Sequence, residues 1–178
     1  MNLSNTKKLY IKRTAFALLI ILTAVLQSTR GAIFSPGGVH AMVLVPLTVS
    51  IAMHEKSVPT LLFGTFAGIM WDMSSITTDG FFSAVLLSIA FFVCVLVMFA
   101  VRNNIYSCLL LSFVSLLLCN TLYWLFFIVL KGYDSAVYIY FRYYFSSVFY
   151  SLLFVPIYYY IVRAISLETA PERKRINY

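Results

Sequence analysis

The chain has 178 residues, of which 62% are hydrophobic and only 11% are charged. Soluble domains carry about 25% charged residues, so this composition excludes a soluble globular domain and predicts an integral membrane protein. The formal net charge is +7, but the basic residues flank apolar runs and form no phosphate-binding patch. This placement follows the positive-inside rule of membrane proteins, and we expect no nucleic-acid partner.

The N-terminus is short, polar and basic, and an apolar run at residues 14–29 follows it. The apolar character extends toward residue 34. A charged start before an apolar core also resembles a signal peptide. Because no clear small-x-small cleavage site follows and further apolar runs come after it, we interpret this run as a retained first helix.

Six apolar runs succeed one another along the chain. They cover residues 14–29, 39–53, 58–76, 81–101, 105–130 and 143–162. The second run is shorter than the ~20 residues that usually cross a bilayer, and it contains Pro46, which can kink a membrane helix without ending it. We expect an all-α, polytopic membrane protein with six transmembrane helices.

The distribution of basic residues predicts the orientation of these helices. With the N-terminus inside, ten of the 13 basic residues fall on the inner side: Lys7, Lys8, Lys12, Arg13, Lys56, Arg102, Arg163, Arg173, Lys174 and Arg175. The outer loops carry Arg30, Lys131 and Arg142. The larger set belongs in the cytoplasm, so both termini are predicted inside. The chain then divides into a cytoplasmic segment (1–13), a membrane domain (14–163) and a basic cytoplasmic tail (164–178).

The third run carries the most informative pattern. Gly64, Gly68 and Asp72 are spaced four residues apart, so they share one helix face. Two glycines at this spacing allow close approach of a neighbouring helix, and we expect helix packing or partner binding there. Gly80 follows eight residues after Asp72.

Asp72 has two interpretations. An acid near the membrane boundary is a candidate functional residue with a partner. It lies toward the end of its own helix, where the dipole disfavours an anion, so we expect it to be ionised and paired with a basic residue on the same side. The candidates are Arg30, Lys131 and Arg142, or a basic residue of a partner protein. In the alternative interpretation, Asp72 only ends the helix at the headgroups.

Aromatic residues gather around the last run. The tyrosines there are Tyr138, Tyr140, Tyr143, Tyr144, Tyr150, Tyr158, Tyr159 and Tyr160. Those near the run's ends fit an aromatic belt at the membrane interface better than a ligand cage.

No catalytic constellation emerges from the sequence. Cys94, Cys108 and Cys119 lie in or beside apolar runs without a CxxC pair, which is typical of inert buried thiols. His40 and His54 sit at run boundaries and form no cluster. Known motifs for metal hydrolysis, serine catalysis and phosphate binding are absent. We therefore expect no enzyme activity, no metal and no cofactor.

The chain resembles the MreD family of small, multi-span, rod shape-determining proteins. The resemblance rests on Leu26-Gln27-Ser28-Thr29 at the end of the first run, on Gly64-x-x-x-Gly68-Ile-x-x-Asp72, on Gly80 before the next span, and on the six-run layout. The chain departs from the family in the first outer loop, which has Ser35-Pro-Gly-Gly instead of an acidic pair.

The resemblance implies a non-catalytic scaffold of the cell-elongation machinery in the bacterial inner membrane. Relatives bind MreC, a protein that crosses the membrane once, and act with MreB filaments and with the RodA and penicillin-binding-protein pair that makes peptidoglycan. The family is also similar in layout to substrate-binding subunits of energy-coupling-factor transporters. A small-solute or lipid transporter subunit is therefore the alternative.

Overall fold

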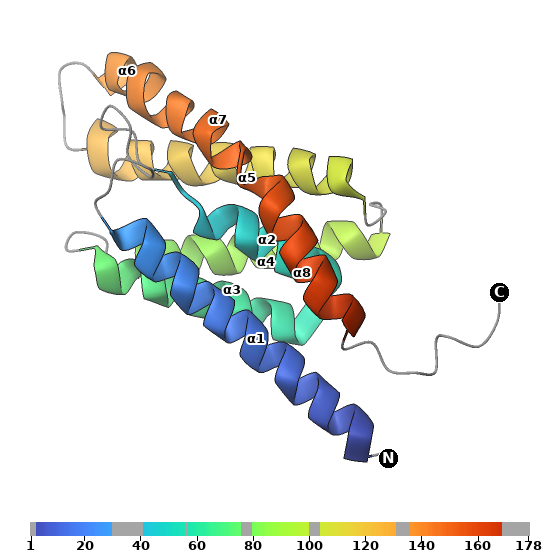
Figure 1. The fold of residues 1–178 in the computed structure, drawn as a ribbon. Helices are drawn as coiled ribbons and strands as arrows, with labels where there is room; N and C mark the ends of the chain where they lie inside the picture. The colour runs from blue at the N-terminus through green and yellow to red at the C-terminus, as the bar shows by residue number, and fades with distance from the viewer. Residues whose placement is uncertain are drawn as a thin grey trace.

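The structure is a computed structural model that describes residues 3–29, 41–55, 57–75, 80–99, 104–130 and 136–168. Within these residues all regular structure is helical, without strands (Figure 1). The first four helices are α1 (Leu3–Ser28), α2 (Leu44–His54), α3 (Ser57–Ser74) and α4 (Phe81–Phe99). Then come α5 (Ile105–Trp124), which continues as the π-helical η2 (Leu125–Val129), α6 (Ala136–Ile139), the π-helical η3 (Tyr140–Phe145), α7 (Ser146–Leu152) and α8 (Val155–Glu168).

Four helical stretches are long and apolar enough to cross a membrane. They are Lys7–Ser28, Phe81–Phe99, Ile105–Val129 and Tyr140–Leu167. Such stretches indicate a multi-pass membrane protein. The described part of each of the six predicted runs contains a helix, but two of these helices are not in this set. α2 has 11 residues, about 16 Å of helix, and α3 is less apolar because it contains glycines and Asp72.

α2 forms the centre of the bundle. Every residue from Leu44 to Met53 is buried, and α1, α3, α4, α5 and α8 pack around it. A helix that is apolar on all sides is expected in such a position. Its hydroxyl groups donate within the helix, as Thr48 Oγ1 does to the Leu44 carbonyl at 2.8 Å. Pro46 lies in the first turn, where its missing N–H interrupts no helical hydrogen bond, so it requires no kink in α2.

Side chains of two other helices satisfy the backbone at the start of α2. The first N–H groups of a helix lack partners within it, and lipid offers none. Gln27 Oε1 of α1 accepts a hydrogen bond from the Leu44 N–H at 3.0 Å. Ser151 Oγ of α7 accepts one from the Met42 N–H at 2.8 Å. These bonds tie α1 and α7 to the centre of the bundle.

Several helix boundaries differ from the sequence prediction. α1 begins at Leu3, so the residues predicted to precede the first span already belong to its helix. The second run becomes helical only at Leu44, and the last helical region extends to Glu168. Apolar runs locate the buried part of a helix, whereas backbone hydrogen bonding continues into polar residues at either end. His40, which was predicted at a run boundary, lies outside the described residues.

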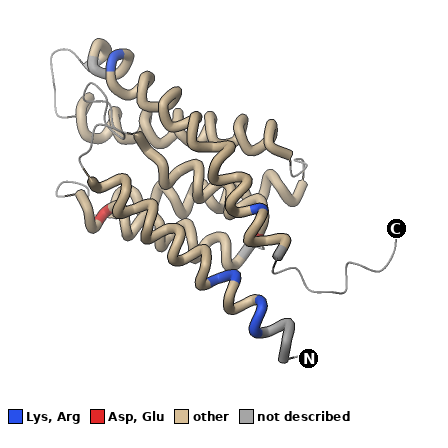
Figure 2. The backbone as a smooth tube through the Cα atoms, viewed as in Figure 1, with Lys and Arg blue, Asp and Glu red and all other residues tan. Residues whose placement is uncertain are grey.

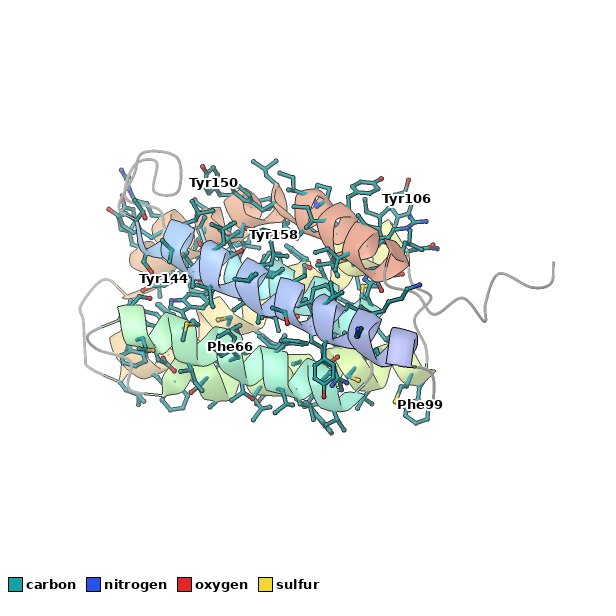
Figure 3. All side chains as sticks on the ribbon, turned by 60° about the horizontal axis from the view of Figure 1, so that its bottom comes forward. Phe66, Phe99, Tyr106, Tyr144, Tyr150 and Tyr158 are labelled. Atoms are coloured by element: carbon teal, nitrogen blue, oxygen red, sulfur yellow. The ribbon has the colours of Figure 1, made fainter. Side chains whose placement is uncertain are left out.

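The charges divide between the two ends of the bundle (Figure 2). The end that holds the start of α1 and the end of α8 carries most of the described basic residues, which are Lys7, Lys8, Lys12, Arg13 and Arg163. The end of α3, which carries Asp72, and the segment after α6, which carries Arg142, lie toward the opposite end (Figure 1). Aromatic side chains project from both ends, for example Tyr144 at one and Phe99 and Tyr106 at the other (Figure 3).

Candidate functional site

The glycine stripe of α3 packs directly against α4. A Cβ atom added to Gly68 would lie 2.2 Å from Ser83 Cα and 2.7 Å from the Phe82 carbonyl oxygen. At Gly64 an added Cβ would lie 2.6 Å from Ala90 Cβ. The two backbones approach so closely at Gly68 that no larger residue fits without moving the helices apart. The stripe therefore holds the α3–α4 hairpin together inside the chain.

Asp72 caps the beginning of α4. Its Oδ1 accepts a hydrogen bond from the Phe82 N–H at 3.1 Å, and its Oδ2 accepts one from the Ser83 N–H at 2.9 Å. These are second and third positions of α4, whose N–H groups are normally satisfied by a side chain at the cap. Here the cap position is Gly80, which has no side chain. Asp72 provides the cap from the preceding helix, and the α4 dipole favours its charge.

Gly80 makes the geometry of this turn possible. Its φ is +78°, in the left-handed region that glycine adopts at little cost. Its carbonyl accepts the Ala84 N–H at 3.2 Å, the first hydrogen bond of the helix. The four residues singled out in the sequence, Gly64, Gly68, Asp72 and Gly80, thus meet at a single structural feature, the α3–α4 hairpin.

An aromatic stack continues this hairpin toward α5. The rings of Trp71 and Phe82 are parallel, with centroids 3.9 Å apart. Phe82 in turn stacks on Tyr123 at 5.7 Å, and Tyr123 contacts Tyr144 of η3 at 5.8 Å. Since Phe82 also donates to Asp72, the cap and the stack fix the same residue of α4. The sequence analysis did not identify this stack, because its rings come from four separate segments.

The predicted ion pair of Asp72 is not formed with Arg142. Within the described residues no salt bridge joins the two, and Arg142 Nη1 instead donates a hydrogen bond to the Tyr138 hydroxyl at 2.7 Å. The other proposed partners, Arg30 and Lys131, lie outside the described residues. Asp72 does not need an ion pair with Arg142, because two backbone N–H groups at a helix N-terminus already stabilise its carboxylate.

The sequence analysis missed a buried ion pair at the opposite end of the bundle. Lys12 Nζ of α1 lies 2.7 Å from Glu55 Oε1, and the two side chains are only 11% and 7% exposed. Lys12 also donates to the His54 carbonyl at 3.4 Å and lies 5.5 Å from the Phe16 ring centroid. His54 Nδ1 lies 3.0 Å from the Ser50 carbonyl oxygen, and its ring contacts Tyr159.

This ion pair joins α1 to the end of α2. Breaking a buried pair by removing one partner leaves an uncompensated charge, which strongly destabilises a protein. Two signals in the sequence point to it: Lys12 lies two residues before the first apolar run, and Glu55, one of only six acidic residues, lies two residues after the second. Antiparallel helices place these two positions at the same depth.

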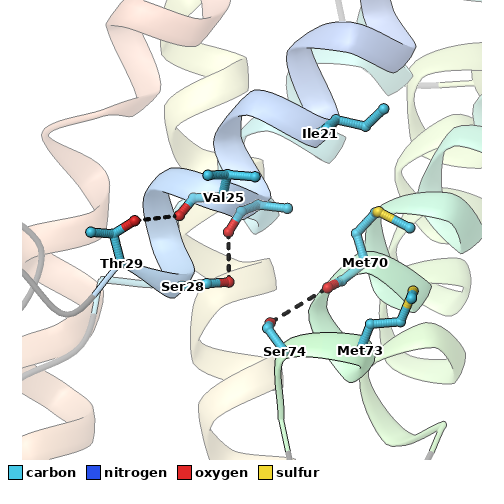
Figure 4. Close-up of a pocket in the computed structure, with 8 residues that line it drawn as sticks. Ile21, Val25, Ser28, Thr29, Met70, Met73 and Ser74 are labelled. Atoms are coloured by element: carbon cyan, nitrogen blue, oxygen red, sulfur yellow. Dashed lines mark hydrogen bonds between the residues drawn. The ribbon is translucent and has the colours of Figure 1, made fainter.

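A shallow groove of about 380 Å³ lies between α1 and α3 (Figure 4). It is lined mainly by apolar side chains, including Ile21, Val25 and Met70. Its hydroxyl groups donate to carbonyls of their own helices, as Ser28 Oγ does to Ala24 at 2.7 Å. The groove therefore offers an apolar surface and no set of converging hydrogen-bond donors.

The described residues contain no group of three or more His, Cys, Asp or Glu side chains that could hold a metal ion. Cys94, Cys108 and Cys119 are buried and free, and Cys108 Sγ lies 3.5 Å from Ser50 Oγ in the apolar interior. The carboxylates of Asp72 and Glu55 are both occupied by structural interactions. The contacts of these side chains are those of helix packing. Comparison of the chain with protein-family models, with curated proteins and with solved structures found no match.

Proposed function

We propose that this chain is a non-catalytic scaffold subunit of the bacterial cell-elongation machinery, similar to MreD and located in the inner membrane. The observation that carries this proposal is that the residues on which the resemblance rests hold helices of the bundle together. Gln27 holds the start of α2, and Gly64, Gly68, Asp72 and Gly80 hold the α3–α4 hairpin. These residues build a rigid body, as a scaffold requires.

The packing of the bundle centre favours a scaffold over the alternative, a transporter subunit. A solute-binding subunit needs a concave pocket with a few converging polar groups. The centre of this bundle is filled by α2, whose residues from Leu44 to Met53 are all buried. The groove between α1 and α3 is apolar and suits a lipid chain better than a polar solute.

The proposal includes six membrane crossings with both termini in the cytoplasm. α2 crosses as a short helix within a shell of longer ones: its start contacts Gln27 and its end contacts Lys12, positions about 22 Å apart along α1. α3 lies alongside α4 and shares its depth. Reporter fusions after Gly38, Lys56, Gly80, Asn104, Asp134 and Tyr178 should alternate outside and inside, ending inside. A cytoplasmic signal at Gly38 would contradict this topology.

The partner in this proposal is a single-pass membrane protein similar to MreC, and through it MreB filaments and the RodA and penicillin-binding-protein synthase. The glycine stripe cannot contact that partner directly, because α4 covers it. Partner binding then depends on the stripe through the shape of the hairpin.

Replacement of the chain in a rod-shaped bacterial host tests this function. Cells depleted of the chain should become round, and the wild-type chain should restore them and co-purify with the single-pass partner. Gly68→Leu should insert but lose the partner, since the hairpin cannot close. Ile69→Leu is the matched control, because the neighbouring Ile69 side chain is 44% exposed. Depleted cells that remain rod-shaped would contradict the proposal.

A further inference from the structure

The surface formed by α6 and η3, which pack beside the end of α5, combines an exposed cation with exposed aromatic rings. Tyr138, Arg142 and Tyr143 are all exposed, and Phe141 beside them is 62% exposed. Neither of the π-helical segments buries any residue completely. π-Helical turns are rare and occur frequently at functional sites, and here two lie at the same end of the bundle. We refer to Tyr138, Arg142 and Tyr143 as the arginine site.

Arg142 lies near one end of a helical stretch that can cross a bilayer. Arg142 and Arg163 lie near the two ends of Tyr140–Leu167, a helical stretch of 28 residues that is long and apolar enough to cross a membrane. About 20 residues are needed to cross the ~30 Å hydrocarbon core. Tyr159, one turn before Arg163, contacts the ring of His54 beside the Lys12–Glu55 pair, whereas Arg142 is the third residue at the opposite end of the stretch. In a membrane crossed by this stretch, each guanidinium would lie near one boundary between acyl chains and headgroups.

The Arg142 guanidinium is held in place and retains donors for an anion. Its Nη1 donates to the Tyr138 hydroxyl at 2.7 Å, and its Cζ lies 5.8 Å from the centroid of the same ring. A guanidinium has five N–H donors in a planar fork that fits two phosphate oxygens. Within the described residues Arg142 forms no salt bridge with a carboxylate.

We propose that the arginine site binds the phosphate of an anionic phospholipid, with its acyl chains lying on the exposed aromatic surface of η3. Charge complementarity and depth select this occupant: the site presents a fixed cation where lipid phosphates lie, above an apolar surface. The inference does not rest on the scaffold function, since a lipid site and a protein partner are measured separately.

The fluorescence of Trp124 offers a direct test. Its ring lies 5.1 Å from Tyr140, two residues before Arg142, and the only other tryptophan is Trp71. A Trp71→Phe protein, which keeps an aromatic ring against Phe82, is reconstituted in vesicles of phosphatidylcholine and phosphatidylglycerol. In one sample the phosphatidylcholine carries bromine on its acyl chains, and in the other the phosphatidylglycerol does. Bromine quenches the fluorescence of a tryptophan that it contacts. The ratio of the two quenching efficiencies reports which lipid occupies the site.

We expect phosphatidylglycerol to be preferred about fivefold, as for one arginine near an anionic surface. Arg142→Gln should reduce the ratio to about one, and Arg142→Lys, which keeps the charge without the fork, should lie between. Arg163→Gln is the matched control and should leave the ratio unchanged. A ratio near one in the Trp71→Phe protein, or the same preference after Arg142→Gln, would overturn the proposal. So would an unchanged lipid ratio together with loss of a protein partner in Arg142→Gln, because Arg142 would then bind a protein carboxylate.

Discussion

Replacing Gly68 with alanine should separate the two helices of the α3–α4 hairpin. The added methyl carbon would lie 2.2 Å from Ser83 Cα, whereas carbon atoms pack at about 3.5–4.0 Å. The helices must therefore move apart by about 1.3 Å, since backbone atoms cannot rotate out of the way. The hydrogen bond from the Ser83 N–H to Asp72, now 2.9 Å, would lengthen to about 4 Å and be lost.

The magnitude follows from these two effects. Overpacking costs about 1–3 kcal/mol, and a hydrogen bond to a charged group contributes about 1.5–3 kcal/mol. We expect Gly68→Ala to lower the free energy of unfolding by about 3–5 kcal/mol. Unfolding in mixed detergent micelles can be followed by the fluorescence of Trp71, whose ring stacks on Phe82, in a Trp124→Phe background.

Gly64 provides the matched control. The clash there is chiefly with the side chain of Ala90, at 2.6 Å. Gly64→Ala should therefore destabilise less than Gly68→Ala, and Gly64→Ala with Ala90→Gly should regain most of the loss. A Gly68→Ala protein within about 0.5 kcal/mol of the wild type, the range of ordinary surface substitutions, would refute the reasoning.

Other changes test the remaining contacts, measured by the same unfolding assay. Asp72→Asn should lower the free energy of unfolding by about 1–2 kcal/mol, because the amide oxygen still accepts one hydrogen bond but the charge is lost. Arg142→Gln should leave stability unchanged. Equal losses in the two variants would instead indicate an ion pair between Asp72 and Arg142. Lys12→Met should cost about 3–5 kcal/mol, and adding Glu55→Gln should recover most of it. A double variant as unstable as the single one would exclude the ion pair. Gln27→Ala should cost about 1–3 kcal/mol by leaving a buried N–H at the start of α2 without an acceptor, and no loss would show that another group replaces it.

The helices were predictable because apolar runs in a membrane protein must satisfy their backbone internally. The glycine spacing likewise predicted close packing, and the structure identifies α4 as the neighbour of Gly68. The role of Asp72 could not be derived from its own helix, where the dipole is unfavourable. It depends on a neighbouring helix N-terminus whose cap residue, Gly80, has no side chain.

The centre of the bundle was harder to predict. The second run is short for a membrane span. Only the packing of five helices around α2 explains how a helix of 11 residues can form the centre of the bundle. The Lys12–Glu55 pair escaped prediction because basic residues near a span are expected at the surface. Which side chains meet across antiparallel helices depends on helix register, and the sequence specifies that register only through packing.

The most direct test of the scaffold function is native mass spectrometry of the chain purified from a rod-shaped bacterium in mild detergent. The proposal predicts an assembly whose mass equals the chain plus a single-pass membrane protein, which dissociates in the Gly68→Leu variant but not in Ile69→Leu. A chain that leaves the membrane without a protein partner and carries a bound small solute would contradict the scaffold function and favour the transporter subunit.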